Sequence, residues 1–199
     1  MSSSLPEQNI DSLPPRLAAF TPEEFGSEGL EIVTALRAGV GLPPGEVPEF
    51  MATFLRHPDL VRGHSQLALK LFNGTLPLRD REIAILRISW LCQSAFEWGE
   101  HVAVGKAVGG LTAEDIERIA QGPEAAGWDD RGALVVRAVD EFHGTGTLSN
   151  AVWEALVQEY SDKQLIELPI LIGQYQGLCY LANACRFRLA KGSAGLETR

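Results

Sequence analysis

The amino-acid sequence predicts an all-α protein with one multi-helix domain. Apolar residues recur at intervals of three and four along nearly the whole chain, which is the period of an amphipathic helix. No stretch alternates with a period of two, as a half-buried strand would. Residues that favour helix starts precede these stretches, and glycines follow them. The 199 residues are enough for one domain with a sizeable core.

The end signals place the elements in order. Residues 1–20 are polar and contain three prolines, so we expect an extended arm that lies on a neighbouring subunit. Thr21 then caps a helix that begins with Pro22 and ends near residue 37, before two glycines. The domain spans residues 21–190, and 191–199 are expected to form a flexible tail. The further helices are predicted over 47–55, 58–73, 78–91, 94–109, 112–122, 130–142, 149–156 and 162–190.

Two features of the last helix add expectations. Pro169, with Gly173 and Gly177, is expected to bend or break it. A shift of about 82 positions also lays Asp80-Arg-Glu-Ile83 on Asp162-Lys-Gln-Leu165, and His101 on Asn183. The similarity is weak, so it indicates either a degenerate internal repeat or a chance likeness between two helices.

Composition excludes several classes of partner. The chain has 26 acidic and 17 basic residues, a net charge of −9, so phosphate backbones and anionic lipids should repel it. We therefore expect no nucleic acid and no membrane as partners. No run reaches the roughly 20 apolar residues that cross a bilayer, and the N-terminus carries no signal sequence. The three cysteines do not have the spacing of metal ligands. Their low and odd number is typical of free thiols, so we expect a cytoplasmic protein.

The stretch from Arg81 to His101 carries the best candidate chemistry. Ser94-x-x-Glu97 has the form of a capping box, which starts a helix at Ser94. Glu97 and His101 are four residues apart, so they share one face of that helix. Glu82 lies on the preceding antiparallel helix and can reach the same point. A carboxylate beside an imidazole, near an apolar wall of Phe96 and Trp98, is a proton-transfer pair.

Other residues are predicted to bind a substrate around this pair. Arg87, on the same helix as Glu82, is the cation chosen to hold a substrate carboxylate, or else it pairs with an acid. His64 is expected to line a pocket, and Tyr175 to add a hydroxyl group together with the amide of Asn183. Ser94 and Trp98 complete this set. His143 is expected to favour the end of its helix.

A plainer interpretation of the same residues remains open. The capping box can be only a cap, Glu97 and His101 a solvated surface pair, and Arg81 with Glu82 only surface charge. Glu97 and His101 alone are too few ligands for a metal site. No cofactor motif is present, so neither a metal nor a cofactor is expected.

The motifs Asp80-Arg81-Glu82, Phe96-Glu-Trp-Gly-Glu-His101 and Gly109-Gly-Leu-Thr112 resemble the carboxymuconolactone decarboxylase family, which includes the alkylhydroperoxidase D-like proteins. The similarity extends over roughly residues 45 to 190. It implies an all-helical fold and homo-oligomers, such as dimers, trimers or hexamers. It also implies a site at the start of the helix with His101, often near a subunit interface.

The departure from the family pattern is equally informative. The peroxidase branch carries a CxxC pair where this sequence has Ser94 and Glu97. A serine and a glutamate cannot run a thiol–disulfide cycle. The resemblance therefore favours a cofactor-independent decarboxylase or isomerase that acts on a small lactone, keto acid or related carbonyl compound. Two alternatives remain: a peroxidase that uses Cys92 as a lone thiol, and a small-molecule-binding oligomer without catalysis.

Overall fold

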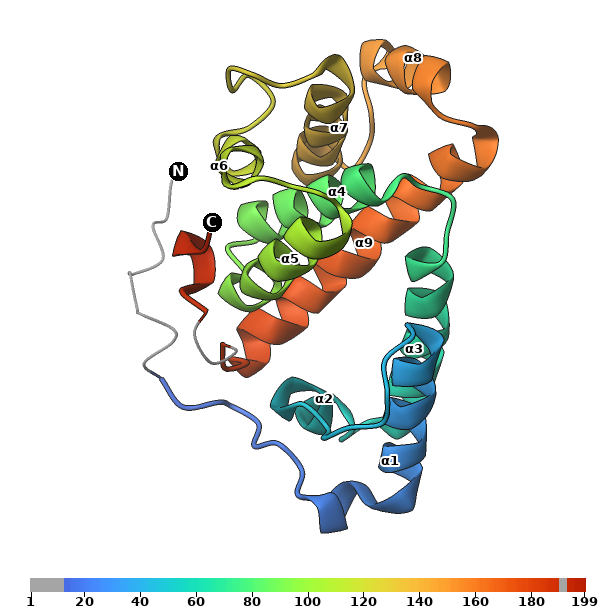
Figure 1. Cartoon of the computed structure of the whole chain (residues 1–199), viewed down its shortest axis with the longest axis vertical. Coiled ribbons are helices and arrows are strands. Elements are labelled where there is room, and N and C mark those ends of the chain that lie inside the picture. The colour runs from blue at the N-terminus through green and yellow to red at the C-terminus, as the bar shows by residue number, and fades with distance from the viewer. Residues whose placement is uncertain (1–12, 190–192) are drawn as a thin grey trace.

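The computed structural model describes residues 13–189 and 193–199, and in this part it is all-α, with no strand. Within the described residues, nine α-helices and one short 3₁₀ helix follow each other (Figure 1). The predicted fold class is confirmed. The bounds are α1 Pro22–Gly39, α2 Glu49–Phe54, α3 Pro58–Phe72, α4 Leu78–Leu91, α5 Ala95–Val108, α6 Ala113–Gln121, α7 Asp130–Thr145, α8 Asn150–Glu159, α9 Asp162–Cys185 and η2 Gly195–Glu197.

Helix α4 is the centre of the fold. It packs against α5, α7 and α9, and every residue from Asp80 to Ser89 is buried. Figure 1 shows α6, α7 and α8 above α4 and α9, with α1, α2 and α3 below them. A helix that is buried on all sides normally lacks charge, because a buried charge is costly unless it is paired. Helix α4 nevertheless carries several ionisable residues, so each of them needs a partner.

The helices α1, α2 and α3 enclose a smaller core of their own. Its buried residues include Ile32 and Val33 from α1 and Val61 from α3. The main core is formed instead by α4 to α9 and includes Trp98, Ile116 and Leu168. The two cores leave a seam where the first three helices meet α5 and α9. Both enclosed cavities described below lie along this seam.

Local end signals account for most helix starts. Thr21 with Glu24, and Thr112 with Asp115, form capping boxes, and the Ser149 hydroxyl accepts a hydrogen bond from the amide of Val152. These side chains satisfy backbone amides that a helix leaves unpaired at its start. The capping box predicted at Ser94 is wrong, because its hydroxyl makes no capping hydrogen bond although α5 begins directly after it.

The connection between α4 and α5 is a tight turn. Gln93 adopts a left-handed conformation with φ of 51°, and the amide of Ser94 donates to the carbonyl of Ser89. The Gln93 side chain also donates to the carbonyl of Trp90. Three residues therefore suffice to reverse the chain, which places α5 antiparallel to α4 as the sequence predicted.

Helix α9 is continuous, although Pro169 lies inside it. The predicted break does not occur, because Leu168, Leu171 and Ile172 around the proline are anchored in the core. The internal similarity also joins segments of different shape: the first spans the turn between α4 and α5, and the second lies within this single helix. Along the described ranges, no helix is long and apolar enough to cross a membrane.

The described terminal segments contact the body of the same chain. The amide of Arg16 donates to the carbonyl of Cys185, and the first part of the predicted arm, residues 1–12, lies outside the described residues. At the other end, the Trp98 indole donates to the Thr198 carbonyl at 3.0 Å. The tail from residue 193 onwards thus contacts the body of the chain, because a buried indole needs an acceptor and finds one there.

Arg87 joins three helices instead of holding a ligand. It forms an ion pair with Asp140 on α7 at 2.6 Å and donates to the carbonyls of Ile119 and Ala120 at the end of α6. These partners fix α6 and α7 against α4. Since the side chain of Arg87 is only 8% exposed, the pair is shielded from solvent.

We expect Arg87→Met to lower the free energy of unfolding by about 3 kcal/mol, since it leaves Asp140 and two carbonyls without their partner. The matched control is Arg137→Met, which removes an exposed pair with Glu124 and should cost less than about 1 kcal/mol. Urea denaturation followed by circular dichroism measures both. Equal losses in the two variants would contradict the role assigned to Arg87.

Candidate active site

Glu82 and His101 form a hydrogen-bonded pair between α4 and α5. The Oε2 atom of Glu82 lies 2.9 Å from Nδ1 of His101, and the two side chains are 1% and 14% exposed. Gly109 favours this arrangement, because a Cβ atom there would lie 3.2 Å from Cγ of Glu82. The prediction that Glu82 reaches His101 from the preceding helix is therefore confirmed. Nε2 of His101 makes no hydrogen bond within the described ranges.

Arg81 completes the pair as a buried cation. Its guanidinium lies 2.8 Å from Oε1 of Glu82 and donates to the carbonyl of Phe72 at the end of α3. The side chain is 4% exposed, so the interpretation of Arg81 and Glu82 as surface charge is wrong. Each carboxylate oxygen of Glu82 thus has one partner, Arg81 on one side and His101 on the other.

The pKa values of the pair are shifted apart. Burial acts to raise the pKa of Glu82, but the hydrogen bond and charge of His101, together with Arg81, outweigh it and hold that pKa below its ordinary value. Burial acts to lower the pKa of His101, but Glu82 and the charge of Glu97 outweigh it and raise that pKa. The charged forms of both residues therefore favour each other.

A small cavity of about 110 Å³ lies beside this pair. Its polar wall comprises Arg81, Glu82, His101, Gln174 and Tyr175. The rings of His101 and Tyr175 meet edge to face with centroids 4.9 Å apart. The side-chain oxygen of Gln174 is buried without a hydrogen-bond partner in the described residues. The cavity therefore offers an ionisable imidazole, a phenol and an unused amide oxygen to one small molecule.

Glu97 and His64 lie on a second cavity, of about 200 Å³, and not on the first. Glu97 is 7% exposed, and burial raises the pKa of its carboxyl group. No hydrogen bond between Glu97 and His101 forms, so the orienting role belongs to Glu82. The prediction that His64 lines a pocket is correct for this second cavity. Ala68 lines both cavities, which are therefore neighbours.

Three residues predicted to bind substrate lie elsewhere. Trp98 is fully buried against Trp90, with ring centroids 5.0 Å apart, and lines neither cavity. Ser94 is also buried and lines neither cavity. The assignment of Arg87 as the substrate cation is wrong, because Asp140 and two carbonyls occupy its guanidinium. Tyr175 alone of the predicted contacts joins Glu82 and His101 at the first cavity.

Sequence reasoning did not assign roles to Arg81 and Gln174. Arg81 gave no signal of burial, since it stands in the charged run Arg79-Asp-Arg-Glu82, which is typical of a helix surface. Gln174 gave none either, because its position on the first cavity depends on how α9 crosses α4. Asn183, expected to reach the site, instead donates to the carbonyl of Cys92 at 2.9 Å. His143 ends α7 as expected, and its Nδ1 atom is buried without a partner in the described residues.

Two thiols lie where α4 meets α9. A hydrogen bond from Cys179 lowers the pKa of the Cys92 thiol, although its partial burial opposes this, and the pKa of Cys179 is raised in turn. Cys179 also lies 3.8 Å from the hydroxyl of Ser89. Both cysteines are free thiols, and neither lines the two cavities. Across residues 13–189 and 193–199, no three His, Cys, Asp or Glu side chains are grouped to hold a metal ion.

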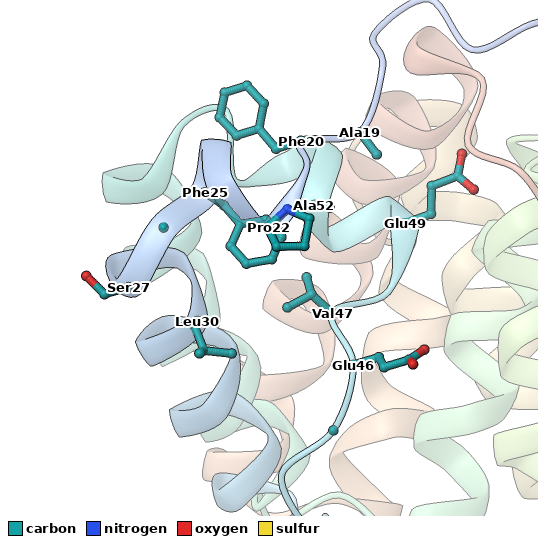
Figure 2. Close-up of a pocket in the computed structure, with 12 residues that line it drawn as sticks. Ala19, Phe20, Pro22, Phe25, Ser27, Leu30, Glu46, Val47, Glu49 and Ala52 are labelled. Carbon is teal, nitrogen blue, oxygen red and sulfur yellow. The ribbon is translucent and has the colours of Figure 1, made fainter.

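A larger hollow lies away from the ionisable pair. It measures about 770 Å³, is open to solvent, and lies between α1 and the segment that leads into α2. Figure 2 shows Pro22, Phe25 and Val47 close together there, while the carboxylates of Glu46 and Glu49 extend to one side. The residues that line the hollow include no histidine, cysteine or cation, so its two glutamates have no basic partner there for proton transfer. We therefore take the smaller cavity beside His101 as the candidate active site.

The fold is that of the alkylhydroperoxidase D-like proteins. A peroxidase-related protein from Ralstonia eutropha, described as having an alkylhydroperoxidase AhpD core, superposes with a TM-score of 0.72 and 15% identity, covering 90% of this chain and 94% of that one. A peroxidase-related protein from Silicibacter superposes with a TM-score of 0.71 and is 13% identical, covering 94% of this chain and 100% of that one. A protein of unknown function from Agrobacterium tumefaciens superposes with a TM-score of 0.61 and is 22% identical, covering 68% of this chain and 93% of that one. It is proposed to be an antioxidant defence protein AhpD.

The sequence also matches the model of the carboxymuconolactone decarboxylase family over residues 48–141. This stretch contains Arg81, Glu82 and His101, on which the resemblance was based. The chain is therefore similar to the carboxymuconolactone decarboxylase family over this stretch, and it shares its fold with the alkylhydroperoxidase D-like proteins. No curated protein matches the sequence.

The pair predicts a titration that can be measured. His101 should titrate above the ordinary value of 6.5, and Glu82→Gln should lower its pKa, because the hydrogen bond and charge of Glu82 then no longer oppose the effect of burial. NMR titration of the imidazole signals measures this, and His101→Gln assigns the signal among the four histidines. An unchanged pKa in Glu82→Gln would show that Glu82 does not control His101.

The same shifts set a pH window for stability. The lowered pKa of Glu82 contributes stability that is lost as pH falls through its folded-state pKa, below 4.5. The raised pKa of His101 contributes stability that is lost as pH rises through its folded-state pKa, above 6.5. The stabilisation from the pair is therefore greatest between these two values, and it should vanish in Glu82→Gln.

Proposed function

We propose that the protein is a cofactor-independent enzyme that decarboxylates or isomerises a small carboxylated lactone, keto acid or related carbonyl compound. The observation that carries the proposal is the bond between Glu82 and Nδ1 of His101, which leaves Nε2 unpaired beside the cavity. Such an imidazole, held in one orientation by a carboxylate, is suited to general acid/base catalysis. The similarity to the carboxymuconolactone decarboxylase family over residues 48–141 supports the proposal.

The charges beside the cavity suit an anionic substrate. With His101 protonated, Arg81 and His101 carry two positive charges against one negative charge on Glu82. The surplus positive charge lies in a buried place, where electrostatic attraction is stronger than in water. In the proposal this surplus attracts the substrate carboxylate, the task first assigned to Arg87. Tyr175 and Gln174 are proposed to orient the rest of the substrate through their polar atoms.

The proposed chemistry moves one proton. When a β-keto or lactone acid loses carbon dioxide, the carbon–carbon bond breaks and its electron pair remains on the substrate as an enolate. His101, protonated on Nε2, then donates its proton to the enolate carbon, and Glu82 stabilises the cation before the transfer. Isomerisation would use the same group twice, first as a base and then as an acid.

We expect His101→Gln to lower turnover by about 100-fold or more, the usual contribution of a general acid or base. The assay screens the wild type against carboxylated lactones and β-keto acids for released carbon dioxide and for deuterium taken up from heavy water. His57→Gln is the control, because His57 caps α3 and lines neither cavity. Activity of the wild type should fall as pH rises above the pKa of His101.

Three outcomes would redirect the assignment. Unchanged turnover in His101→Gln would remove the acid/base role. Hydroperoxide consumption by the wild type, in the presence of a thiol reductant and abolished by Cys92→Ser, would favour the peroxidase alternative. Ligand-induced stabilisation with no product from any compound would favour a binding protein without catalysis.

We also propose that the chain forms a homo-oligomer through α9. Ile166, Ile170 and Tyr180 are 69%, 48% and 57% exposed, and with Gly173 and Gly177 they fall on one face of the helix. Exposed apolar rows of this kind favour protein contacts. Sedimentation velocity should give an assembly that Ile166→Glu weakens and Leu30→Glu, on α1, leaves intact. A wild type that sediments as a monomer would contradict this.

We propose that the protein is located in the cytoplasm. The chain has only three cysteines, an odd number, and this is typical of free thiols in a reducing compartment. Fractionation of cells that express the protein, followed by detection with an antibody, tests this. Recovery in a membrane or secreted fraction would contradict it.

A further inference from the structure

The second cavity has features of a ligand site that the proposed acid/base chemistry does not use. It lies on the seam between the first three helices and α5 and α9, and measures about 200 Å³. This is smaller than the roughly 300–1,000 Å³ of pockets for drug-sized molecules, so it suits a molecule with a single ring. One end of the cavity is aromatic, and the polar residues on its wall are His64, Ser65, Glu97 and Glu100.

The aromatic end consists of three phenylalanines from separate segments. The ring centroids of Phe50 and Phe96 are 5.2 Å apart, those of Phe96 and Phe187 are 5.4 Å apart, and those of Phe50 and Phe187 are 6.2 Å apart. All three pairs are tilted or edge to face, the geometry that aromatic rings prefer. Since all three rings line the cavity, a further ring placed there can make the same contacts.

Two of these polar residues, Glu97 and His64, lack partners among the residues that the structure describes. Glu97 is more than nine-tenths buried and makes no hydrogen bond or ion pair with the residues that the structure describes. Nε2 of His64 is buried and likewise unpaired in the described ranges. A buried polar group without a partner is destabilising, and two such groups on one cavity indicate that a ligand supplies the missing hydrogen bonds.

The environment favours an uncharged ligand. Burial raises the pKa of Glu97 and lowers the pKa of His64, so both groups are shifted toward their neutral forms. Neither then offers a full charge to pair with an ion. Glu100, which is half-buried and also lines the cavity, would in addition repel an anion. A neutral carboxyl group donates one hydrogen bond, and a neutral imidazole nitrogen can accept one.

We propose that this cavity binds an uncharged monocyclic phenol, with its ring against Phe50, Phe96 and Phe187 and its hydroxyl group between Glu97 and His64. A phenolic hydroxyl both donates and accepts, so it matches an imidazole acceptor and a carboxyl donor at once. The site stands on its own geometry and does not depend on His101 as a catalyst.

Met51 provides a direct probe, because it lines the cavity and the chain has only two methionines. In wild-type protein labelled with ¹³C at the methionine methyl groups, phenol should shift the Met51 signal through its ring current and leave the Met1 signal in place. Met51→Leu assigns the signals. A Met51 signal that does not move up to millimolar phenol would overturn the proposal without any need for a cavity variant.

Calorimetric titration then tests the chemistry of the site. We expect phenol to bind more tightly than toluene, which lacks the hydroxyl group, cyclohexanol, which lacks the aromatic ring, and benzoate, which is charged. Glu97→Leu and His64→Phe should each weaken phenol binding by about 3- to 10-fold, the loss of one hydrogen bond. Glu97→Gln, which keeps a donor, should retain more affinity than Glu97→Leu.

The matched control is His143→Phe, since His143 also carries a buried, unpaired nitrogen but lies on α7, away from the cavity. It should leave phenol binding unchanged. Equal losses in His64→Phe and His143→Phe, or equal affinity for phenol and cyclohexanol, would overturn the proposal. Because the readout is binding, His101→Gln should still bind phenol even if the proposed acid/base reaction is absent.

Discussion

The buried array of Arg81, Glu82 and His101 is the interaction on which the arrangement of this protein depends. Three ionisable side chains lie in the core, where isolated charges are strongly disfavoured. They are tolerated because Glu82 accepts from a cation on each side, and because Arg81 also binds the last carbonyl of α3. The array thereby connects α3, α4 and α5, so the same contacts that hold these helices together also orient the imidazole.

The array also explains why two neighbouring cavities differ in character. The cavity beside His101 is bordered by buried positive charge, whereas the cavity beside Glu97 is apolar and lacks a buried cation. Glu97 and His101 are one turn apart on α5, and Ala68 of α3 separates the two spaces. One helix therefore presents an ionised group to the first space and a carboxyl group shifted toward its neutral form to the second. The contrast arises from whether a partner compensates burial.

The sequence predicted the helices well because their signals are local. The caps at Thr21, Thr112 and Ser149 depend on side chains within three residues, and α4 matches its predicted bounds. The meeting of Glu82 and His101 was also predictable, since a short connection forces neighbouring helices to lie antiparallel.

The site was less predictable where contacts join distant parts of the chain. Arg87 was assigned to a substrate, but its partner Asp140 lies 53 residues away on a helix whose position no local pattern reveals. Trp98 was placed on the wall of the site, but its indole turns to Thr198, 100 residues further on. The burial of Arg81 was missed for the same reason: helical spacing indicates which residues share a face, and only the packed fold indicates what covers that face.

The tight turn at Gln93 has a consequence for how such a protein can evolve. It fixes a spacing of 19 residues between Glu82 and His101, and each residue inserted between them would rotate α5 by about 100° relative to α4. Point substitutions in this segment can be absorbed by neighbouring side chains, but an insertion or deletion would turn the imidazole away from its carboxylate. Natural selection should therefore tolerate substitutions in this segment far more readily than insertions or deletions. The spacing is then a better indicator of common ancestry than overall sequence identity.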